Sequence, residues 1–466
     1  MTRQVHAALA GGTRSQHATS ESSYTMGAPA AATPAAGPLG LTRAAAFSRS
    51  ESGVVVLSLA AIALHVLDDN YMQPQPGTSA GDHLASGLIP LAVLAAVASL
   101  YPRLRAGLRA SLAMTMGAIG IAFGIPGAYY LLHGSASGDH YSGLLAILAG
   151  AVLLLSGPAT LWKARRTHGT RRRRYLRRAL ATATGVVAAL LSLTFIVFPV
   201  GYAYIYTHTG RTAVTPDLGV PFESVNVTTS DALKLAAAYV PSKNRAAVIL
   251  FPGATRADDA RILIRHGYGV LLLDPRGQGR SDGDIVRWAG DRDILAGVDF
   301  LRSRPDVDAG RIGGFGFSVG GELLLEAAAR STGLKAVVSE GAGIRVGEGL
   351  EAGEGMSESV RALWNPASFV LSAATTIFSN HGPPPAIVDR IGRIAPRAVF
   401  LIYADPGMGG EATRQPRYFE AAGQPKAIWK VPGSAHTGGI DARPAEYERR
   451  VVAFFDRALL KRGETP

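Results

Sequence analysis

The sequence predicts a bundle of about five transmembrane helices followed by an α/β domain built on a mostly parallel sheet. Long apolar segments run through the first part of the chain, whereas short β-rich segments alternate with helical patterns after Thr207. The mean hydropathy is +0.17 and charged residues make up 18% of the chain, against about 25% in an average soluble protein. Both values fit a chain of 466 residues that joins a membrane region to a water-soluble one.

The positive charge lies mainly in the apolar region. Sixteen Lys and Arg residues and six Asp and Glu residues precede Arg211, so this region carries +10 of the formal net charge of +12. The basic residues form short clusters between hydrophobic segments, which is typical of membrane topology and not of a nucleic-acid-binding face. We therefore expect a lipid bilayer, and no nucleic acid, among the partners. The absence of cysteine excludes disulfides, thiolate catalysis and cysteine-based metal sites.

Residues 1–50 are rich in Ala, Ser, Thr, Gly and Pro and show no sustained apolar periodicity. This composition predicts a disordered N-terminal tail. The tail has no continuous apolar core of the kind found in secretion signals, so we expect no cleaved signal peptide.

Residues 51–207 form the predicted membrane domain. A helix needs about 20 mostly apolar residues to cross a bilayer. The last three apolar segments meet this length, the second nearly meets it, and the first does so only with its flanking residues. The five segments are Gly53–Leu67, Leu84–Leu100, Ser111–Leu132, Tyr141–Trp162 and Ala179–Tyr206. His65 is almost the only ionisable residue in them, which favours a tether or scaffold over a transporter.

The connections between these segments alternate in charge. One basic connection holds Arg103, Arg105 and Arg109, and the other holds nine Lys and Arg residues between positions 163 and 178. The connections at 68–82 and 133–140 are acidic or neutral. Because Lys- and Arg-rich loops stay in the cytoplasm, we expect a multi-pass protein of the plasma membrane with a cytoplasmic N-terminus. The domain after the fifth segment is then extracytoplasmic.

Residues 208–466 form the predicted α/β domain. Continuous apolar strands separated by helical patterns favour a parallel sheet that is covered by helices on both faces. The predicted strands are "SVNVTT", "LKLAAAYV", "AAVILF", "GVLLLD", "RIGGFGF", "KAVVSE", "AVFLIYA" and "AIWKV". The predicted helices include 258–265, 290–302, 320–330 and 414–422.

The stretch "GFSVG" places Ser318 between Gly316 and Gly320, with a strand before it and a helix after it. This is the G-x-S-x-G spacing of a nucleophile held on a sharp strand-to-helix turn. Side chains two residues away on either side would collide with such a turn, so glycine is required there. The turn also directs the backbone N–H of Val319 and the start of the helix toward an oxyanion.

Three other segments strengthen this interpretation. "VILFPGAT" is a buried strand whose end can offer the backbone N–H of Ala254 or Thr255 to an oxyanion. "GVLLLDPRGQGRSDG" is a second buried strand followed by a glycine-rich turn. "VPGSAHTGG" places His436 on the loop after the last strand. The order serine, acid, histidine is the order in which this architecture supplies its catalytic residues.

In order and at suitable intervals, "DPRGQGRSDG", "GFSVGGE" and "GSAHTGG" make residues 222–460 resemble the α/β-hydrolase superfamily. Within it, the region is most similar to the dienelactone hydrolase and prolyl-oligopeptidase-like serine hydrolases. The region departs from many of these relatives at "FPGAT", where they carry His-Gly. Because backbone N–H groups form the oxyanion hole, this difference leaves the expected activity intact. The membrane region resembles no family that informs on function.

In the expected mechanism, Ser318 attacks an acyl carbonyl and His436 takes its proton as general base. The acid that orients the imidazole is expected after "AVFLIYA", where both Glu411 and Asp405 are candidates. Glu411 is favoured because its longer side chain reaches further and because related chains place a glutamate after such a glycine pair. Glu340 is a third candidate, and it is more simply a structural carboxylate below the site.

Residues 341–389 form an insertion after Glu340 that contains an apolar helix around 362–378. Such insertions often cover the active site, so we predict a small lid there. No H-x-x-x-H, P-loop or EF-hand pattern occurs in the α/β domain, so we expect no metal, nucleotide or other cofactor.

The sequence therefore predicts a membrane-anchored serine hydrolase that cleaves an ester, thioester or amide in a small or acyl-bearing substrate. One alternative is an acyltransferase that uses the same nucleophile. Another is a catalytically inert sensor or binding protein whose working part is the membrane region, since a fold alone does not imply a function.

Overall fold

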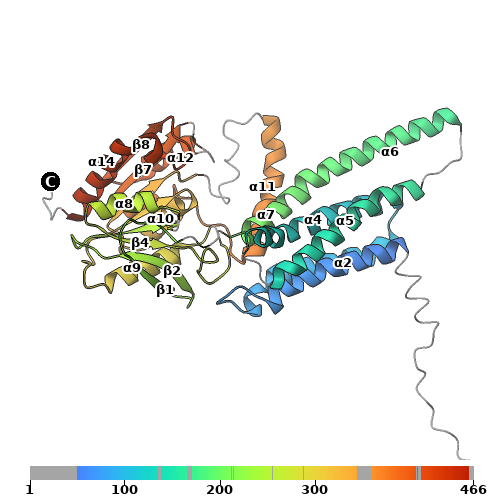
Figure 1. The fold of residues 1–466 in the computed structure, drawn as a ribbon. Helices are drawn as coiled ribbons and strands as arrows, with labels where there is room; N and C mark the ends of the chain where they lie inside the picture. Colours follow the sequence, from blue (N-terminus) through green and yellow to red (C-terminus); the bar gives the residue numbers. More distant parts are fainter. Residues whose placement is uncertain are drawn as a thin grey trace, which may run out of the picture. The chain divides into compact units, whose positions relative to one another are not determined.

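The computed structural model describes residues 50–460 except 135–137, 165–169, 211–212, 214, 254, 287, 344–357, 406 and 408–410. The predicted tail at 1–50 lies outside the described residues apart from Ser50. The described residues form a helical bundle followed by an α/β domain, so the predicted fold class is confirmed (Figure 1).

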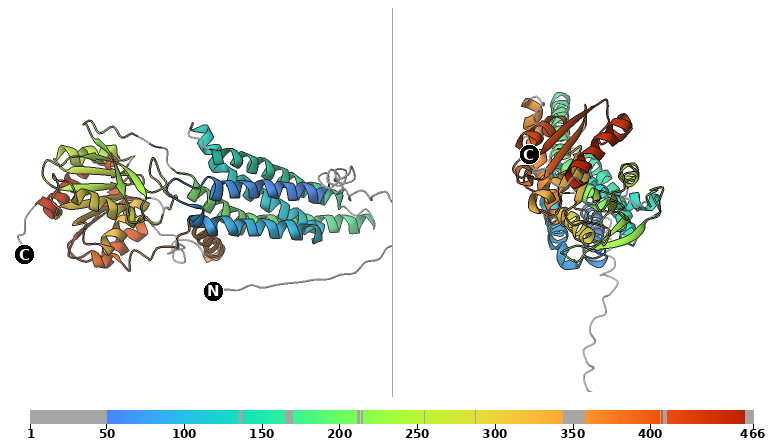
Figure 2. Two further views of the ribbon diagram at one scale, coloured as in Figure 1. Left: turned by 90° about the horizontal axis from the view of Figure 1, so that it is seen from below. Right: turned by 90° about the vertical axis from the view of Figure 1, so that its left-hand side faces the viewer.

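Helices make up the first part of the chain (Figure 2). The α-helices are α2 (Glu51–Leu67), α3 (Leu84–Leu100), α4 (Ala106–Leu132), α5 (Gly138–Lys163), α6 (Arg171–Ser192) and α7 (Phe198–His208). Short helical turns join or extend them: η1 (Asp68–Met72), η2 (Ala80–His83), η3 (Tyr101–Arg103) and η4 (Leu193–Val197). Among the described residues, five continuous helical stretches are long and apolar enough to cross a membrane: Glu51–Met72, Ala80–Arg103, Ala106–Leu132, Gly138–Lys163 and Arg171–His208.

Glycines let α4 and α5 approach closely. A Cβ atom at Gly117 would lie 2.6 Å from the carbonyl oxygen of Gly150, and one at Gly150 would lie 2.5 Å from the carbonyl oxygen of Gly117. In a bilayer, small residues of this kind allow backbones to pack where apolar side chains gain nothing by leaving lipid. No residue of α6 between Arg171 and Ser192 is buried, by contrast, and a Cβ at Gly185 would meet no atom within 4 Å.

The α/β domain contains an eight-stranded sheet, counted over the described residues, in the order β1-β2-β4-β3-β5-β6-β7-β8. The strands are β1 (Glu223–Thr228), β2 (Lys234–Val240), β3 (Ala247–Phe251), β4 (Gly269–Leu273), β5 (Ile312–Phe317), β6 (Ala336–Glu340), β7 (Ala398–Asp405) and β8 (Lys426–Pro432). β2 runs antiparallel to β1 and β4. The other six strands, which follow in the sheet order β4-β3-β5-β6-β7-β8, are parallel to one another. β3, β4, β5 and β6 are buried at every position, which explains why their sequences are apolar apart from Ser339 and Glu340 at the end of β6.

Helices cover both faces of this sheet (Figure 1). The covering helices are α8 (Ala257–Arg265), α9 (Asp291–Arg302), α10 (Val319–Arg330), α12 (Glu411–Ala421), α13 (Gly439–Ala442) and α14 (Pro444–Phe455), with the turns η6 (Ile391–Ile394) and η7 (Asp456–Leu460). A further helix, α11 (Glu358–Ser379), does not lie on the sheet. Side chains from α9, α10 and α12 share one buried core with the sheet, and those from α8 and α14 share the other.

The insertion between β6 and β7 contains α11, close to the predicted helix at 362–378. Its C-terminal half packs against the bundle: Phe378 and Ala374 are buried with Tyr204 of α7 and Phe123 of α4. The Phe378 ring meets the Tyr204 ring edge-on at a centroid distance of 5.3 Å. Residues 344–357 of the predicted lid lie outside the described residues, and the lid stays a prediction.

Candidate active site

Three of the predicted catalytic residues follow the carboxyl ends of neighbouring parallel strands. Ser318 directly follows β5, Glu411 begins α12 after β7, and His436 lies on the loop after β8. Parallel strands present all their carboxyl ends at one edge of the sheet, so these three side chains converge although they are far apart in sequence.

The imidazole of His436 bridges the other two side chains. Its Nε2 lies 2.8 Å from Oγ of Ser318, and its Nδ1 lies 3.1 Å from Oε1 of Glu411. Glu411 is fully buried, whereas the His436 side chain retains 19% of its exposure. These distances allow the carboxylate to accept the Nδ1 proton, which leaves Nε2 free to accept the proton of the serine hydroxyl.

The other two candidate acids lie elsewhere. Asp405 forms an ion pair of 2.8 Å with Lys430 of β8, and both side chains are largely exposed. Glu340 accepts a hydrogen bond of 2.9 Å from the backbone N–H of Gly439 and another from the hydroxyl of Tyr447. Glu411 is the first residue of α12, three positions before the predicted start of this helix, where a carboxylate faces the positive end of the helix dipole.

Ser318 occupies a strained turn between β5 and α10. Its φ of 53° and ψ of −127° lie outside the regions that residues with side chains ordinarily adopt. A Cβ at Gly316 would lie 2.5 Å from the carbonyl oxygen of Gly320, and one at Gly320 would lie 2.6 Å from Cδ of Pro252. Neither position has room for a side chain.

Of the residues predicted to form an oxyanion hole, Val319 and Thr255 belong to the described part of the chain. Val319 is the first residue of α10, so its N–H belongs to the helix N-terminus. Thr255 lies just before α8 on the loop after β3, and the neighbouring Ala254 lies outside the described residues.

The side chain of Arg256, on the loop after β3, contacts the loop that carries His436. Arg256 donates to the side-chain oxygen of Thr437 at 2.9 Å and to its carbonyl oxygen at 3.3 Å. The same guanidinium lies 4.0 Å from the ring centroid of Phe317, directly before Ser318. Gly341 has a φ of +72°, and a Cβ there would lie 3.0 Å from Cε1 of His436. The imidazole is thus enclosed by residues that limit its movement.

A pair of buried carboxyls lies beneath the histidine loop. The hydroxyl of Tyr447 lies between Glu340 and Asp259, at 3.0 Å from Oδ1 of Asp259. Burial and the negative charge of Glu340 together raise the pKa of Asp259 to about 7. Burial also raises the pKa of Glu340. Because one hydroxyl can donate only one proton, the pair is best satisfied when one of the two carboxyls is protonated.

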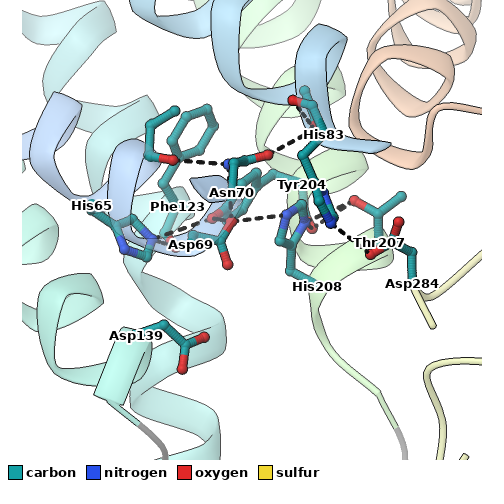
Figure 3. Close-up of polar contacts among 12 residues, drawn as sticks. His65, Asp69, Asn70, His83, Phe123, Asp139, Tyr204, Thr207, His208 and Asp284 are labelled. Carbon is teal, nitrogen blue, oxygen red and sulfur yellow. Dashed lines mark hydrogen bonds and ion pairs between the residues drawn. The ribbon is translucent and has the colours of Figure 1, made fainter. Parts of the chain in front are cut away.

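A second group of polar side chains lies on helices of the bundle and on the loop after β4 (Figure 3). The hydroxyl of Tyr204 lies 3.2 Å from Nε2 of His65 and 3.2 Å from Oδ2 of Asp69, and Nε2 of His208 lies 3.3 Å from the same carboxylate oxygen. Nearby, Nε2 of His83 lies 3.6 Å from Oδ1 of Asp284, on the loop after β4. We call His65, Asp69, His83, Asp139, His140, Tyr204, His208 and Asp284 the bundle cluster.

The sequence interpretation missed this cluster because its helices are longer than predicted. The first and fifth predicted segments end at Leu67 and Tyr206, whereas the helical stretches continue to Met72 and His208. Asp69 and His208 therefore lie within candidate membrane spans and not in loops. The only available signal was helical spacing: His65 and Asp69, and likewise Tyr204 and His208, stand four residues apart and share a helix face.

The described residues offer no ready metal site. No group of three or more His, Cys, Asp or Glu side chains among them is arranged to hold a metal ion.

Residues 168–376 match the family described as X-Pro dipeptidyl-peptidase (S15 family). This match covers a little under half of the chain; it includes Ser318 and ends before Glu411 and His436. A polyketide transferase, grgF, of a Penicillium species is 34% identical over 121 residues, which are 24% of this chain and 41% of that protein. A thiohydrolase, aneE, of Aspergillus aculeatus is 29% identical over 130 residues, which are 25% of this chain and 41% of that protein. The chain thus spans about two fifths of these relatives.

Among solved structures, the chain is similar to the α/β hydrolase GrgF from a Penicillium species, with 22% identity and a TM-score of 0.44. That match covers 52% of this chain and all of the other. An esterase of Pyrococcus furiosus is 21% identical with a TM-score of 0.43, over 54% of this chain and 97% of the esterase.

Proposed function

We propose that the C-terminal region, whose sheet and flanking helices form an α/β-hydrolase fold, is a serine hydrolase acting through Ser318, His436 and Glu411. The observation that carries the proposal is the unbroken contact from Glu411 through His436 to Ser318, at 3.1 and 2.8 Å. The strained backbone of Ser318 supports it, because such strain persists where the surrounding structure holds a residue for function.

The geometry supports a two-step acyl transfer. His436 takes the Ser318 proton on Nε2 while Oγ attacks the carbonyl carbon of an ester, thioester or amide. The oxyanion then receives the backbone N–H of Val319 and one from Ala254 or Thr255. His436 returns the proton to the leaving group, and Glu411 stabilises the imidazolium formed in between. Water attacks the acyl-enzyme in the second step, with His436 again as base.

The bundle would anchor this enzyme in the plasma membrane. Both basic connections lie at one end of the antiparallel helices, and the C-terminal region follows α7 at the other end. Because basic loops stay in the cytoplasm, the N-terminus would be cytoplasmic and the hydrolase domain extracytoplasmic. Residues 341–389 remain the proposed lid, and the closer likeness to dienelactone hydrolases remains a prediction.

A covalent probe tests the nucleophile. The full-length protein in detergent should react with a fluorophosphonate, and the Ser318→Ala variant should not. Ser331→Ala is the matched control, because Ser318 and Ser331 lie at the two ends of α10. Labelling that survives in Ser318→Ala would refute the assignment. A membrane-impermeant fluorophosphonate applied to intact cells should label the protein, and protection until lysis would refute the proposed sidedness.

An acyltransferase that uses the same nucleophile is the second candidate. It is favoured by the partial similarity to a protein named as a polyketide transferase, whereas the similarity to a thiohydrolase favours water as the acceptor. Product analysis with thioester substrates and added alcohols separates the two, since a strict hydrolase yields free acid alone.

A further inference from the structure

The bundle cluster lines a cavity of about 520 Å³. Its walls come from the ends of the helical stretches near Asp69, His83, Tyr130, Asp139 and His208, and from the loop after β4 between Gly277 and Ile285. This volume lies within the roughly 300–1,000 Å³ that is typical of sites for small molecules. Gln73 and Pro76 at its edge are exposed, whereas Asp69 and His65 are buried.

The cavity is acidic in a protein that is basic overall. Its lining includes the carboxylates of Asp69, Asp139 and Asp284 and, among the described residues, neither Lys nor Arg. The whole chain carries 47 Lys and Arg against 35 Asp and Glu. The remaining ionisable groups that line it are tyrosines and four histidines, and the histidines are uncharged when deprotonated. A hollow with charges of one sign concentrates ions of the opposite sign.

Aromatic rings lie beside these carboxylates. The Tyr204 ring is stacked between Phe123 and His208, with centroid distances of 4.1 and 3.8 Å, and Phe378 meets it edge-on. On the other side of the cavity, the Tyr130 ring stacks on His140 at 4.5 Å. Both faces of the Tyr204 ring are covered by these neighbours, so the carboxylates are the groups that would recognise an ammonium ion, through ion pairing.

Burying ionisable side chains inside the helical bundle costs free energy, which favours a functional role for them. Asp69 and His208 lie in candidate membrane spans, where ionisable residues are rare and usually mark functional sites. The arrangement does not suit a metal ion, since no three His, Asp or Glu side chains of the described residues converge on a common point.

We propose that this cavity binds an organic cation bearing an ammonium group. The site is separate from the serine nucleophile and does not depend on the proposed hydrolase activity. The ammonium group could belong to a soluble amine or to a lipid headgroup, because both present the same charge to the carboxylates.

The binding should strengthen as pH rises. With its four histidines protonated and three aspartates ionised, the lining carries a formal charge of +1, and with neutral histidines it carries −3. Affinity for a cation should therefore be higher when these histidines are neutral than when they are protonated. The titratable groups that face the cavity are His65 and Asp69 (α2 and η1), His83 (η2), Tyr130 (α4), Asp139 and His140 (α5), Tyr204 and His208 (α7) and Asp284, which also faces His381.

The test uses the full-length protein in nanodiscs of phosphatidylglycerol, which has no ammonium group. Choline and putrescine serve as quaternary and primary probes, and acetate and glycerol as anionic and neutral controls. We expect calorimetric binding of a cation that is stronger at pH 8 than at pH 6. A second arm replaces the lipid with phosphatidylcholine. If lipid headgroups fill the site, the unfolding temperature should rise and the response to soluble choline should disappear.

Paired variants locate the binding. Asp69→Asn should weaken the cation by roughly tenfold or more, the usual value of a charged contact, whereas Asp68→Asn should not. Asp68 is the adjacent acid, bonded to Gln73 and outside the cavity lining. If Asp69→Asn fails to fold, Asp284→Asn on the loop after β4 provides the same comparison, with Asp282→Asn as its control. Binding of acetate instead of cations would overturn the proposal. So would the absence of any cation effect in both lipids, or equal losses in the paired variants.

Discussion

The two polar sites of this protein differ in what holds their side chains. Ser318, Glu411 and His436 follow the ends of strands, so the hydrogen-bonded sheet positions them. The bundle cluster instead lies mostly on the helices themselves, and its members bond one another: Tyr204 links His65 to Asp69 across α7 and α2. A substitution at the first site should therefore change chemistry and leave the fold intact. At the second site, one substitution changes both ligand contacts and helix packing.

The strongest test of this contrast removes the carboxylate of Glu411 from the candidate active site. The Glu411→Gln variant has no negative charge to stabilise the imidazolium of His436. We therefore expect kcat/KM for an ester substrate to fall by roughly 10³- to 10⁴-fold, with the unfolding temperature little changed. Asp405→Asn is the control, because its exposed pair with Lys430 is worth about 1 kcal/mol or less. A larger loss of activity in Asp405→Asn would transfer the acid role to that residue.

The buried carboxyl pair gives an intermediate effect, on stability and not on chemistry. The pKa of Asp259 is about 7 in the folded protein, above its usual value, so the folded state holds this proton more tightly. Its contribution to stability is complete at acidic pH and is lost as pH rises toward and through 7. The Asp259→Asn variant lacks this titration, so its free energy of unfolding should fall less between acidic and neutral pH, by as much as roughly 4 kcal/mol.

The measurement is the unfolding temperature of the full-length protein between pH 4 and pH 8. Asp258→Asn should leave the pH dependence unchanged, because Asp258 is exposed and paired with Arg261. An unaltered pH profile in Asp259→Asn would show that the proton is held elsewhere.

The smallest expected effect is a loss of stability in the bundle, tested by substituting two glycines. Gly117→Leu places a side chain against the backbone of α5 and should destabilise the bundle by about 2 kcal/mol or more. Gly185→Leu on α6 meets open space and should be tolerated. Thermal unfolding in detergent measures both. Equal stability of the two variants would mean that α4 and α5 are not in such close contact.

The catalytic region could be predicted from the sequence to a large extent because its signals are local. Eight short β-rich segments predicted the eight strands of the described residues, and the glycines around Ser318 predicted a strand-to-helix turn. The choice between Glu411 and Asp405 could be argued only from reach and resemblance. It depends on where α12 begins, which is set by packing against β7 and β8 and not by local pattern.

The bundle cluster could not be predicted because no local motif defines it. Its residues come from several helices and one loop after β4, and each looks ordinary alone: Asp69 resembles a loop acid and Asp139 an acid in the first turn of a helix. Only the crossing of the helices brings them together. Helix ends are also the least certain part of such a prediction, and here both Asp69 and His208 lie at helix ends.

The packing of α11 against the bundle bears on whether the α/β domain could exist without the bundle. Proteolysis in the segment after His208 would strip Ala374 and Phe378 of the partners that now bury them. An α/β domain without the bundle would expose these apolar side chains to water and would tend to aggregate. A protein that kept the α/β domain without the bundle would need polar residues at these two positions of α11.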